Sequence, residues 1–212
     1  MTDRRSRPLA TTPLMTARRT ALLVTLLAAL LGLAACTSGK DASAPQGGGF
    51  QLVTPGGRTE FDYPVADRKP LGEIAGPAVT GDRRISLADY PDTVIVLNFW
   101  GAWCAPCRAE ADDLDTAFHD VKAKGVQFIG INVKEKAKSD AADFEASRDI
   151  PYPSIFDQQT RTLLSIRGYP VNSIPSTIVL DRQHRVAHIW LTLLSSPAPL
   201  VDVAGRVAAE AP

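Results

Sequence analysis

The chain has 212 residues, of which 45% are hydrophobic, and its 23 basic side chains are balanced by 23 acidic ones. This length is sufficient for one domain with a substantial buried core. Because no basic excess is present, the composition argues against nucleic acid as a partner.

The first 35 residues have the pattern of an export signal. Five arginines and a single acid, Asp3, lie within the first 19 residues, and an apolar stretch follows over residues 21–33. This stretch is too short for a stable membrane span, which favours a cleaved leader. The alternative is an uncleaved N-terminal helix in which Cys36 is a spare thiol.

The leader ends in Leu33-Ala34-Ala35-Cys36, which resembles the bacterial lipobox. The resemblance implies that Cys36 is lipidated and becomes the mature N-terminus. Cleavage removes five basic residues and one acid, leaving 18 basic and 22 acidic residues and a net charge of about −4. Residues 36–49 are predicted to be the lipidated cysteine and a flexible, glycine-rich tether. Residues 50–212 are predicted to form one domain.

Two apolar runs in this domain, residues 93–100 and 126–133, show no alternation of polar and apolar positions. They are therefore expected to be central strands that are covered on both faces. Between them, residues 104–124 carry apolar side chains at helical spacing, and Gly125 ends this predicted helix.

The remaining elements are predicted from turn residues and shorter apolar runs. Residues 50–69 are assigned only to edge strands or loops, and residues 78–87 to a hairpin that turns at Thr80-Gly81-Asp82. Residues 134–138, which include three lysines, indicate a solvated loop and the start of a helix. The later elements are a helix over 139–148 with Ser139 as its N-cap, a strand at 154–156, a helix over 158–167, strands at 177–180 and 185–191, and a helix over 197–210 whose buried stripe includes Val203. This order describes an α/β sandwich.

The motif Trp103-Cys104-Ala105-Pro106-Cys107 lies where the first central strand meets the predicted helix. A cysteine at a helix N-terminus is stabilised as a thiolate by free N–H groups and by the positive end of the helix dipole. The spacing brings both sulfurs together on one turn, so Cys104 is the candidate nucleophile at the exposed end and Cys107 the resolving thiol behind it. A permanent structural disulfide or half of a zinc site is the alternative.

Two segments of the domain resemble the landmarks of one protein family. Residues 96–110, which contain the cysteine pair, and residues 169–177, which contain Ile174-Pro175-Ser176-Thr177, are similar to motifs of the membrane-tethered TlpA/ResA-like thiol-disulfide oxidoreductases. The resemblance spans residues 70–210 and implies a thioredoxin-like three-layer sandwich with a central mixed sheet. It also implies an inserted strand-helix unit near residues 154–167.

The same resemblance assigns roles to residues around the cysteines. It implies that Pro175 is cis, so that the backbone of Ile174 pairs with a bound peptide, whereas a trans loop proline is the alternative. Glu110 matches an acid of the family and is either a proton relay or a first-turn acid favoured by the helix dipole. Asn98 replaces the buried acid of cytoplasmic thioredoxins. Trp103 is expected to shape the docking surface or to be a rim aromatic.

The family resemblance implies an extracytoplasmic thiol-disulfide oxidoreductase anchored to the cell membrane by lipid. Its expected partners are exported proteins with disulfides, including apocytochrome c during cytochrome c maturation, and a membrane thiol-disulfide electron carrier. The pair Cys104 and Cys107 would itself be the redox centre, with no separate cofactor and no metal ion. The competing hypothesis is a copper-binding lipoprotein of the same fold without disulfide turnover. A peroxidase fits less well, because peroxiredoxins place a lone cysteine in a different motif.

Overall fold

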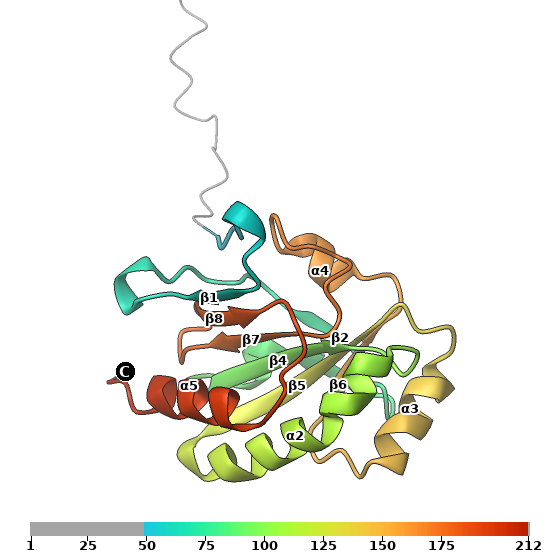
Figure 1. Ribbon diagram of the computed structural model, residues 1–212. Helices are drawn as coiled ribbons and strands as arrows, with labels where there is room; N and C mark the ends of the chain where they lie inside the picture. The colour runs from blue at the N-terminus through green and yellow to red at the C-terminus, as the bar shows by residue number, and fades with distance from the viewer. Residues whose placement is uncertain (1–48, 212) are drawn as a thin grey trace, which may run out of the picture. The chain divides into compact units, whose positions relative to one another are not determined.

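The computed structural model describes residues 49–211, which are organised around a six-stranded mixed sheet (Figure 1). Its strands are β1 (Glu60–Asp62), β4 (Val94–Trp100), β5 (Val126–Val133), β6 (Ser154–Asp157), β7 (Ser176–Leu180) and β8 (Val186–Trp190). They lie in the order β1-β8-β7-β4-β5-β6. β4, β5 and β6 are parallel, whereas the pairs β4 with β7, β7 with β8 and β1 with β8 are antiparallel. The mixed sheet confirms the predicted fold class.

Strand β4 lies in the interior of this sheet, and all seven of its residues are buried. Its side chains alternate between the two faces, as the pleat of a strand requires. Ile95, Leu97 and Phe99 belong to one hydrophobic cluster, and Val94 and Val96 belong to another. Burial on both faces explains why polar residues do not alternate here, and it confirms the prediction for this strand.

One face of the sheet is covered by helices α2 (Ala105–Val121) and α5 (Ala198–Ala208), which lie side by side in Figure 1. Their apolar side chains enclose Val94 and Val96. Helix α3 (Lys138–Ser147) extends this layer, because the ring of Phe144 packs 5.3 Å from the ring of Trp100. Val203, predicted to be part of the buried stripe of α5, is only half-buried.

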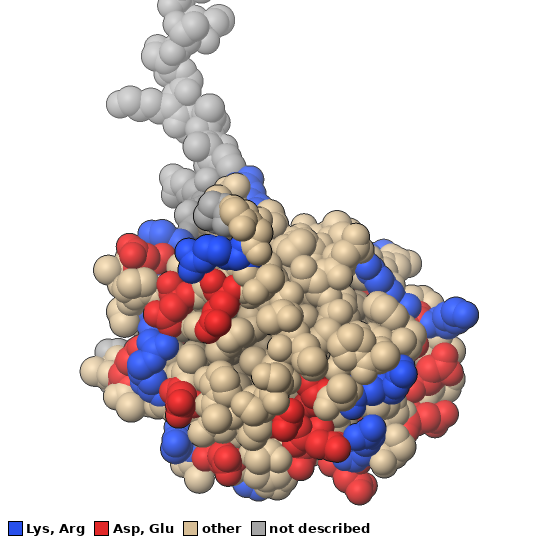
Figure 2. Space-filling model, viewed as in Figure 1, with Lys and Arg blue, Asp and Glu red and all other residues tan. Residues whose placement is uncertain are grey.

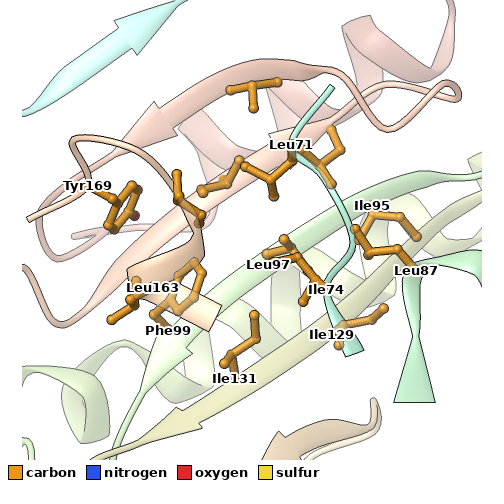
Figure 3. Close-up of a cluster of buried hydrophobic side chains, with 14 of the residues drawn as sticks. Leu71, Ile74, Leu87, Ile95, Leu97, Phe99, Ile129, Ile131, Leu163 and Tyr169 are labelled. Carbon is orange, nitrogen blue, oxygen red and sulfur yellow. The ribbon is translucent and has the colours of Figure 1, made fainter. Parts of the chain in front are cut away.

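The other face is covered by the N-terminal part of the domain and by the short helix α4 (Arg161–Ser165). Leu71, Ile74 and Leu87 from the N-terminal part join Leu163 of α4 in the cluster that contains Leu97 (Figure 3). The apolar core therefore occupies both sides of the sheet. Helices, sheet and this cover form the three predicted layers.

The N-terminal part contributes an edge strand and a hairpin. β1 lies within residues 50–69, the segment predicted to hold only edge strands or loops, and it pairs with β8 at the edge of the sheet. In the hairpin, β2 (Ala75–Pro77) pairs with β3 (Arg84–Ser86), so pairing begins before the predicted residue 78. The physical reason is that Val79 leaves the hairpin and donates its N–H to the Ser154 carbonyl of β6 at 2.8 Å.

The region of the predicted strand-helix unit contains β6, an edge strand parallel to β5, and α4. The predicted helix over 158–167 is wrong in length, because the chain first turns at Thr160, which has a left-handed φ of 56°. The Asp157 carboxylate then accepts the N–H groups of Arg161 and Thr162 at the start of α4. Helix α3 also begins one residue before Ser139, which is therefore inside its first turn and is not the N-cap.

The described surface carries charges of both signs. On the face shown in Figure 2, Lys and Arg side chains lie among Asp and Glu side chains around the margin, and uncharged residues fill much of the middle. Within residues 49–211, no helix combines the length and hydrophobicity needed to span a membrane. The predicted leader, Cys36 and most of the predicted tether lie outside the described residues.

Leu97→Ala is expected to lower the free energy of unfolding by about 2–5 kcal/mol, because it removes buried atoms and leaves a cavity in the core. Leu164→Ala is the matched control: Leu164 is 67% exposed, and its truncation is expected to change stability by less than about 0.5 kcal/mol. Denaturant unfolding measures both values. Equal losses in the two variants would contradict the assignment of Leu97 to the core.

Candidate functional site

The two cysteines lie at the start of α2, directly after β4 and the short loop over residues 101–103. Cys104 is the N-cap residue, and its Sγ accepts a hydrogen bond from the N–H of Cys107 at 3.2 Å. Pro106 is tolerated in this first turn because its missing N–H would have no intrahelical partner. The two sulfurs are joined in a disulfide of 2.05 Å. The pair therefore lies at the predicted strand-to-helix junction.

Both cysteines are nearly covered, with an exposed fraction of 3% each. The prediction that Cys104 lies at an exposed end of the helix is therefore wrong for the oxidised form. Its Sγ lies 3.8 Å from the carbonyl oxygen of Ile174, and Ala102 and Ile174 pack in one small cluster with both cysteines. A client protein must contact these neighbouring loops to reach the sulfur.

The loop that covers Cys104 contains a cis peptide bond between Ile174 and Pro175, as the family resemblance implies. Pro175 is buried and Ile174 is half-buried. The N–H of Ile174 donates to the carbonyl of Asn172 at 3.0 Å within the same loop. Of the two backbone groups of Ile174, the carbonyl is therefore the one that meets the cysteine.

Glu110 lies one turn after Cys107 on α2 and is 1% exposed. Its carboxyl oxygens accept hydrogen bonds from two different elements: Oε1 from Asn98 Nδ2 at 2.9 Å, and Oε2 from the N–H of Leu194 at 3.1 Å. Burial raises the pKa of Glu110 to about 7, although both hydrogen bonds oppose this rise. A carboxyl with this pKa can take up or release a proton at neutral pH.

A small cavity of about 20 Å³ lies beside the cysteines, with space for about one water molecule. Its lining includes Asn98, Cys107, Tyr152 and Ser154. Asn98 thus borders the cavity next to Cys107 and also donates to the carboxyl of Glu110. The partner of the buried acid therefore borders the same cavity as the resolving cysteine.

The loop before the cysteines is held from the end of β5. Trp103 is 49% exposed, and its Nε1 donates to the carbonyl of Val133 at 3.0 Å. The N–H of Ala102 donates to Glu135 Oε2 at 2.7 Å. A groove of about 610 Å³ opens here, lined by Ala102, Trp103, Lys134, Glu135, Lys136 and Asp140. The exposed indole therefore stands at the edge of a groove beside the disulfide.

Glu135 is the residue of this region that the sequence analysis missed. It lies between two lysines in the segment predicted to be a solvated loop, yet it is 4% exposed. Its burial depends on hydrogen bonds from Ala102 and Asn132, and neither contact leaves a pattern in the sequence. The prediction of a solvated loop is therefore wrong for Glu135, although the flanking Lys134 and Lys136 are exposed.

The three histidines of the chain lie in separate places. His119 is on α2, His184 lies in the turn between β7 and β8, and His188 is on β8. Among residues 49–211, no group of three or more His, Cys, Asp or Glu side chains is arranged to hold a metal ion.

A disulfide at this strand-to-helix junction, on a mixed sheet flanked by helices, defines a thioredoxin-like thiol-disulfide oxidoreductase. The chain belongs to the AhpC/TSA family, whose model matches residues 69–189. The matched segment is more than half of the chain, and it contains the cysteine pair, Glu110 and Pro175. Together with the relatives below, it confirms the resemblance that was drawn from two short motifs.

Relatives of known structure or curated sequence carry related descriptions. A secreted thiol-disulfide isomerase from Corynebacterium glutamicum is 39% identical, with a TM-score of 0.75 and coverage of 77% of this chain and 100% of that chain. A DsbF homologue from Corynebacterium diphtheriae is 42% identical, with a TM-score of 0.71 and coverage of 75% and 99%. Thiol-disulfide oxidoreductase ResA from Bacillus subtilis is 29% identical over 110 residues, 52% of this chain and 59% of that protein. The match thus spans less than two thirds of this curated relative.

The raised pKa of Glu110 predicts that stability falls as the pH rises from about 4.5 to about 7. In that window the unfolded chain has already lost the proton that the folded protein still holds, so deprotonation favours the unfolded state. The full effect is about 3 kcal/mol and is complete above the folded pKa. Glu110→Gln removes the titrating group, so denaturant unfolding of this variant is expected to depend less on pH by that amount. Identical pH dependence in both proteins would show that Glu110 is not protonated in this window.

Proposed function

We propose that the protein is a lipid-anchored, extracytoplasmic thiol-disulfide oxidoreductase that reduces disulfides in exported proteins. The proposal is carried by the disulfide between Cys104 and Cys107 at the N-terminus of α2, one turn from a buried carboxyl whose pKa is about 7. The redox couple is contained in the chain itself, so exchange needs no separate cofactor.

In the first step, the Cys104 thiolate of the reduced protein attacks one sulfur of a client disulfide. The S–S bond of the client breaks, a mixed disulfide forms with Cys104, and the second client sulfur leaves as a thiolate. The start of α2 favours the Cys104 thiolate, because the N–H of Cys107 points at its Sγ and the helix dipole is positive there.

In the second step, Cys107 resolves the mixed disulfide. Its thiol loses a proton, and the resulting thiolate attacks Cys104 Sγ, so that the internal disulfide forms and the client leaves with two additional electrons. Glu110 is the candidate base for this proton, since a carboxyl with a pKa near 7 is partly ionised at neutral pH. A thiol carrier must then return two electrons to the cysteine pair.

Client docking is assigned to Trp103, Ile174 and Pro175. Trp103 offers an exposed aromatic surface directly before Cys104, and the Ile174 carbonyl lies 3.8 Å from the reactive sulfur. An aromatic face and a backbone carbonyl bind an extended chain without demanding one particular sequence. Such a site suits an enzyme with several clients.

The proposed location is the extracytoplasmic face of the cell membrane. The support is the leader-like segment and the lipobox-like motif ending at Cys36, together with the secreted relative from Corynebacterium glutamicum. Clients would be exported proteins with disulfides, and the family resemblance adds the haem-attachment cysteines of apocytochrome c. A membrane thiol-disulfide carrier would supply the electrons.

Insulin reduction in the presence of dithiothreitol tests the exchange chemistry. The wild-type protein is expected to accelerate the reaction, and Cys104→Ser is expected to abolish turnover because no nucleophile remains. Cys107→Ser that is reduced, freed of dithiothreitol and then mixed with insulin is expected to accumulate a mixed disulfide with the client, visible on non-reducing gels, because no resolving thiol is present. Bound copper without turnover in the wild-type protein would instead support the copper-binding alternative.

The cysteine pair of the wild-type protein allows the direction of electron flow to be tested. A reductant is expected to have a reduction potential near that of thioredoxin, about −270 mV, whereas a strong oxidant lies near about −120 mV. Equilibration of the cysteine pair with defined thiol buffers measures the value. A potential near the oxidant limit would reverse the proposed direction but leave the exchange chemistry intact.

Cys36→Ser is expected to release the full-length protein from the membrane fraction of a bacterial host, because the attachment point for lipid is lost. Cell fractionation and incorporation of labelled palmitate measure this directly. Thr37→Ser is the matched control and is expected to leave both unchanged. Label on the Cys36→Ser protein would contradict lipidation at this residue.

A further inference from the structure

The segment after β5 holds a buried acid for which the exchange chemistry above has no use. Glu135 is 4% exposed, and its Oε2 accepts hydrogen bonds from the N–H of Ala102 at 2.7 Å and from Asn132 Nδ2 at 3.2 Å. A buried carboxylate is stable only with such donors. One of the two donors belongs to the loop that leads into the active-site cysteines.

Ala102 is held at both of its backbone groups. Its N–H donates to Glu135, and its carbonyl accepts a hydrogen bond from the guanidinium of Arg108 on α2 at 2.8 Å. The same loop is closed by the N–H of Cys104, which donates to the carbonyl of Gly101 at 3.1 Å. The position of Ala102 therefore sets the direction in which the side chain of the next residue, Trp103, extends from the backbone.

The Trp103 indole is fixed although almost half of the residue is exposed. Its Nε1 donates to the carbonyl of Val133 at 3.0 Å. Its ring lies over Gly101, where an added Cβ would be 2.7 Å from the Cε2 atom of the indole. The indole is thus held by its own Nε1, by Gly101 beneath the ring and by the anchored Ala102. An exposed aromatic ring that is fixed in this way is preorganised to contact another chain.

We propose that Glu135 is a positioning residue for disulfide exchange. By anchoring Ala102, Glu135 keeps the side chain of Trp103 in place as one wall of the adjacent groove. The extended chain around a client disulfide docks against this wall. The groove measures about 610 Å³ and runs along Glu135 and its flanking lysines. This inference rests on the proposed function. A fixed wall lowers the ordering cost of docking, so Glu135 affects the KM for protein clients and leaves sulfur chemistry unchanged.

Kinetics of the reduced full-length protein with two substrates test the proposal. Glu135→Ala is expected to raise the KM for insulin about tenfold and to change kcat by less than about twofold, because the hydrogen bond that anchors Ala102 is lost. Reduction of hydroxyethyl disulfide, which is too small to reach along the groove, is expected to be unchanged. Glu135→Gln retains a carbonyl acceptor for Ala102 and is expected to restore most of the affinity. Asp143→Ala, which removes an exposed acid of α3, is the matched control.

Two further variants show whether Glu135 acts through the indole. In a Trp103→Ala background, Glu135→Ala is expected to add less than about a twofold rise in KM, because coupled residues are not additive. Gly101→Ala displaces the indole without removing Glu135 and is expected to reproduce the rise in KM. An unchanged KM in Glu135→Ala, or its full effect in the absence of Trp103, would overturn the proposal.

The two substrates distinguish a protein that does not exchange disulfides from one in which Glu135 has no positioning role. If the protein does not exchange disulfides, the wild type will reduce neither insulin nor hydroxyethyl disulfide. If Glu135 only supports the fold, Glu135→Ala will slow both substrates equally, whereas Gly101→Ala will still raise the KM for insulin alone. That second pattern would overturn the positioning role while the exchange activity stands.

Discussion

The buried carboxyl of Glu110 connects three parts of the chain that are distant in sequence. It is carried by α2, and it accepts hydrogen bonds from Asn98 of β4 and from Leu194 before α5. These contacts hold the cysteine-bearing helix against the sheet. Because burial and hydrogen bonding act on its pKa in opposite directions, the group titrates near neutral pH and does not remain permanently neutral or permanently charged. Structural support and proton chemistry are therefore properties of one side chain.

Features of the fold that depend on local pattern could be predicted from the sequence. The unbroken apolar runs of β4 and β5 reflect strands that are buried on both faces. Helix α2 ends at Val121, and the single 3-10 turn over Lys122–Lys124 that follows it ends where Gly125 takes a left-handed φ of 79°. The place of the disulfide follows from its motif. The approach of Ile174 to Cys104 was available only through family resemblance, since no local signal brings residues 70 positions apart together.

Features that depend on a distant partner could not be predicted. Glu135 has the sequence context of a solvent-exposed acid, and it is buried only because Ala102, 33 residues earlier, supplies a donor. Cys104 is covered because another loop folds over it, so helix position alone overestimates its exposure. The late start of α4 is, by contrast, a local effect: Thr160 takes a left-handed φ of 56°, and the Asp157 carboxylate accepts the free N–H groups of Arg161 and Thr162 at the start of the helix.

The order of the sheet has a consequence for how the chain folds while it is synthesised. β4 lies between β5 and β7, and β4 ends at Trp100, whereas β7 begins only at Ser176. A nascent chain that stops short of β7 therefore presents an unpaired edge along the seven residues of β4, all of which are buried in the folded protein. Such an edge is a template for self-association between chains. Chaperones that keep the polypeptide unfolded until β7 has emerged would protect this strand from aggregation.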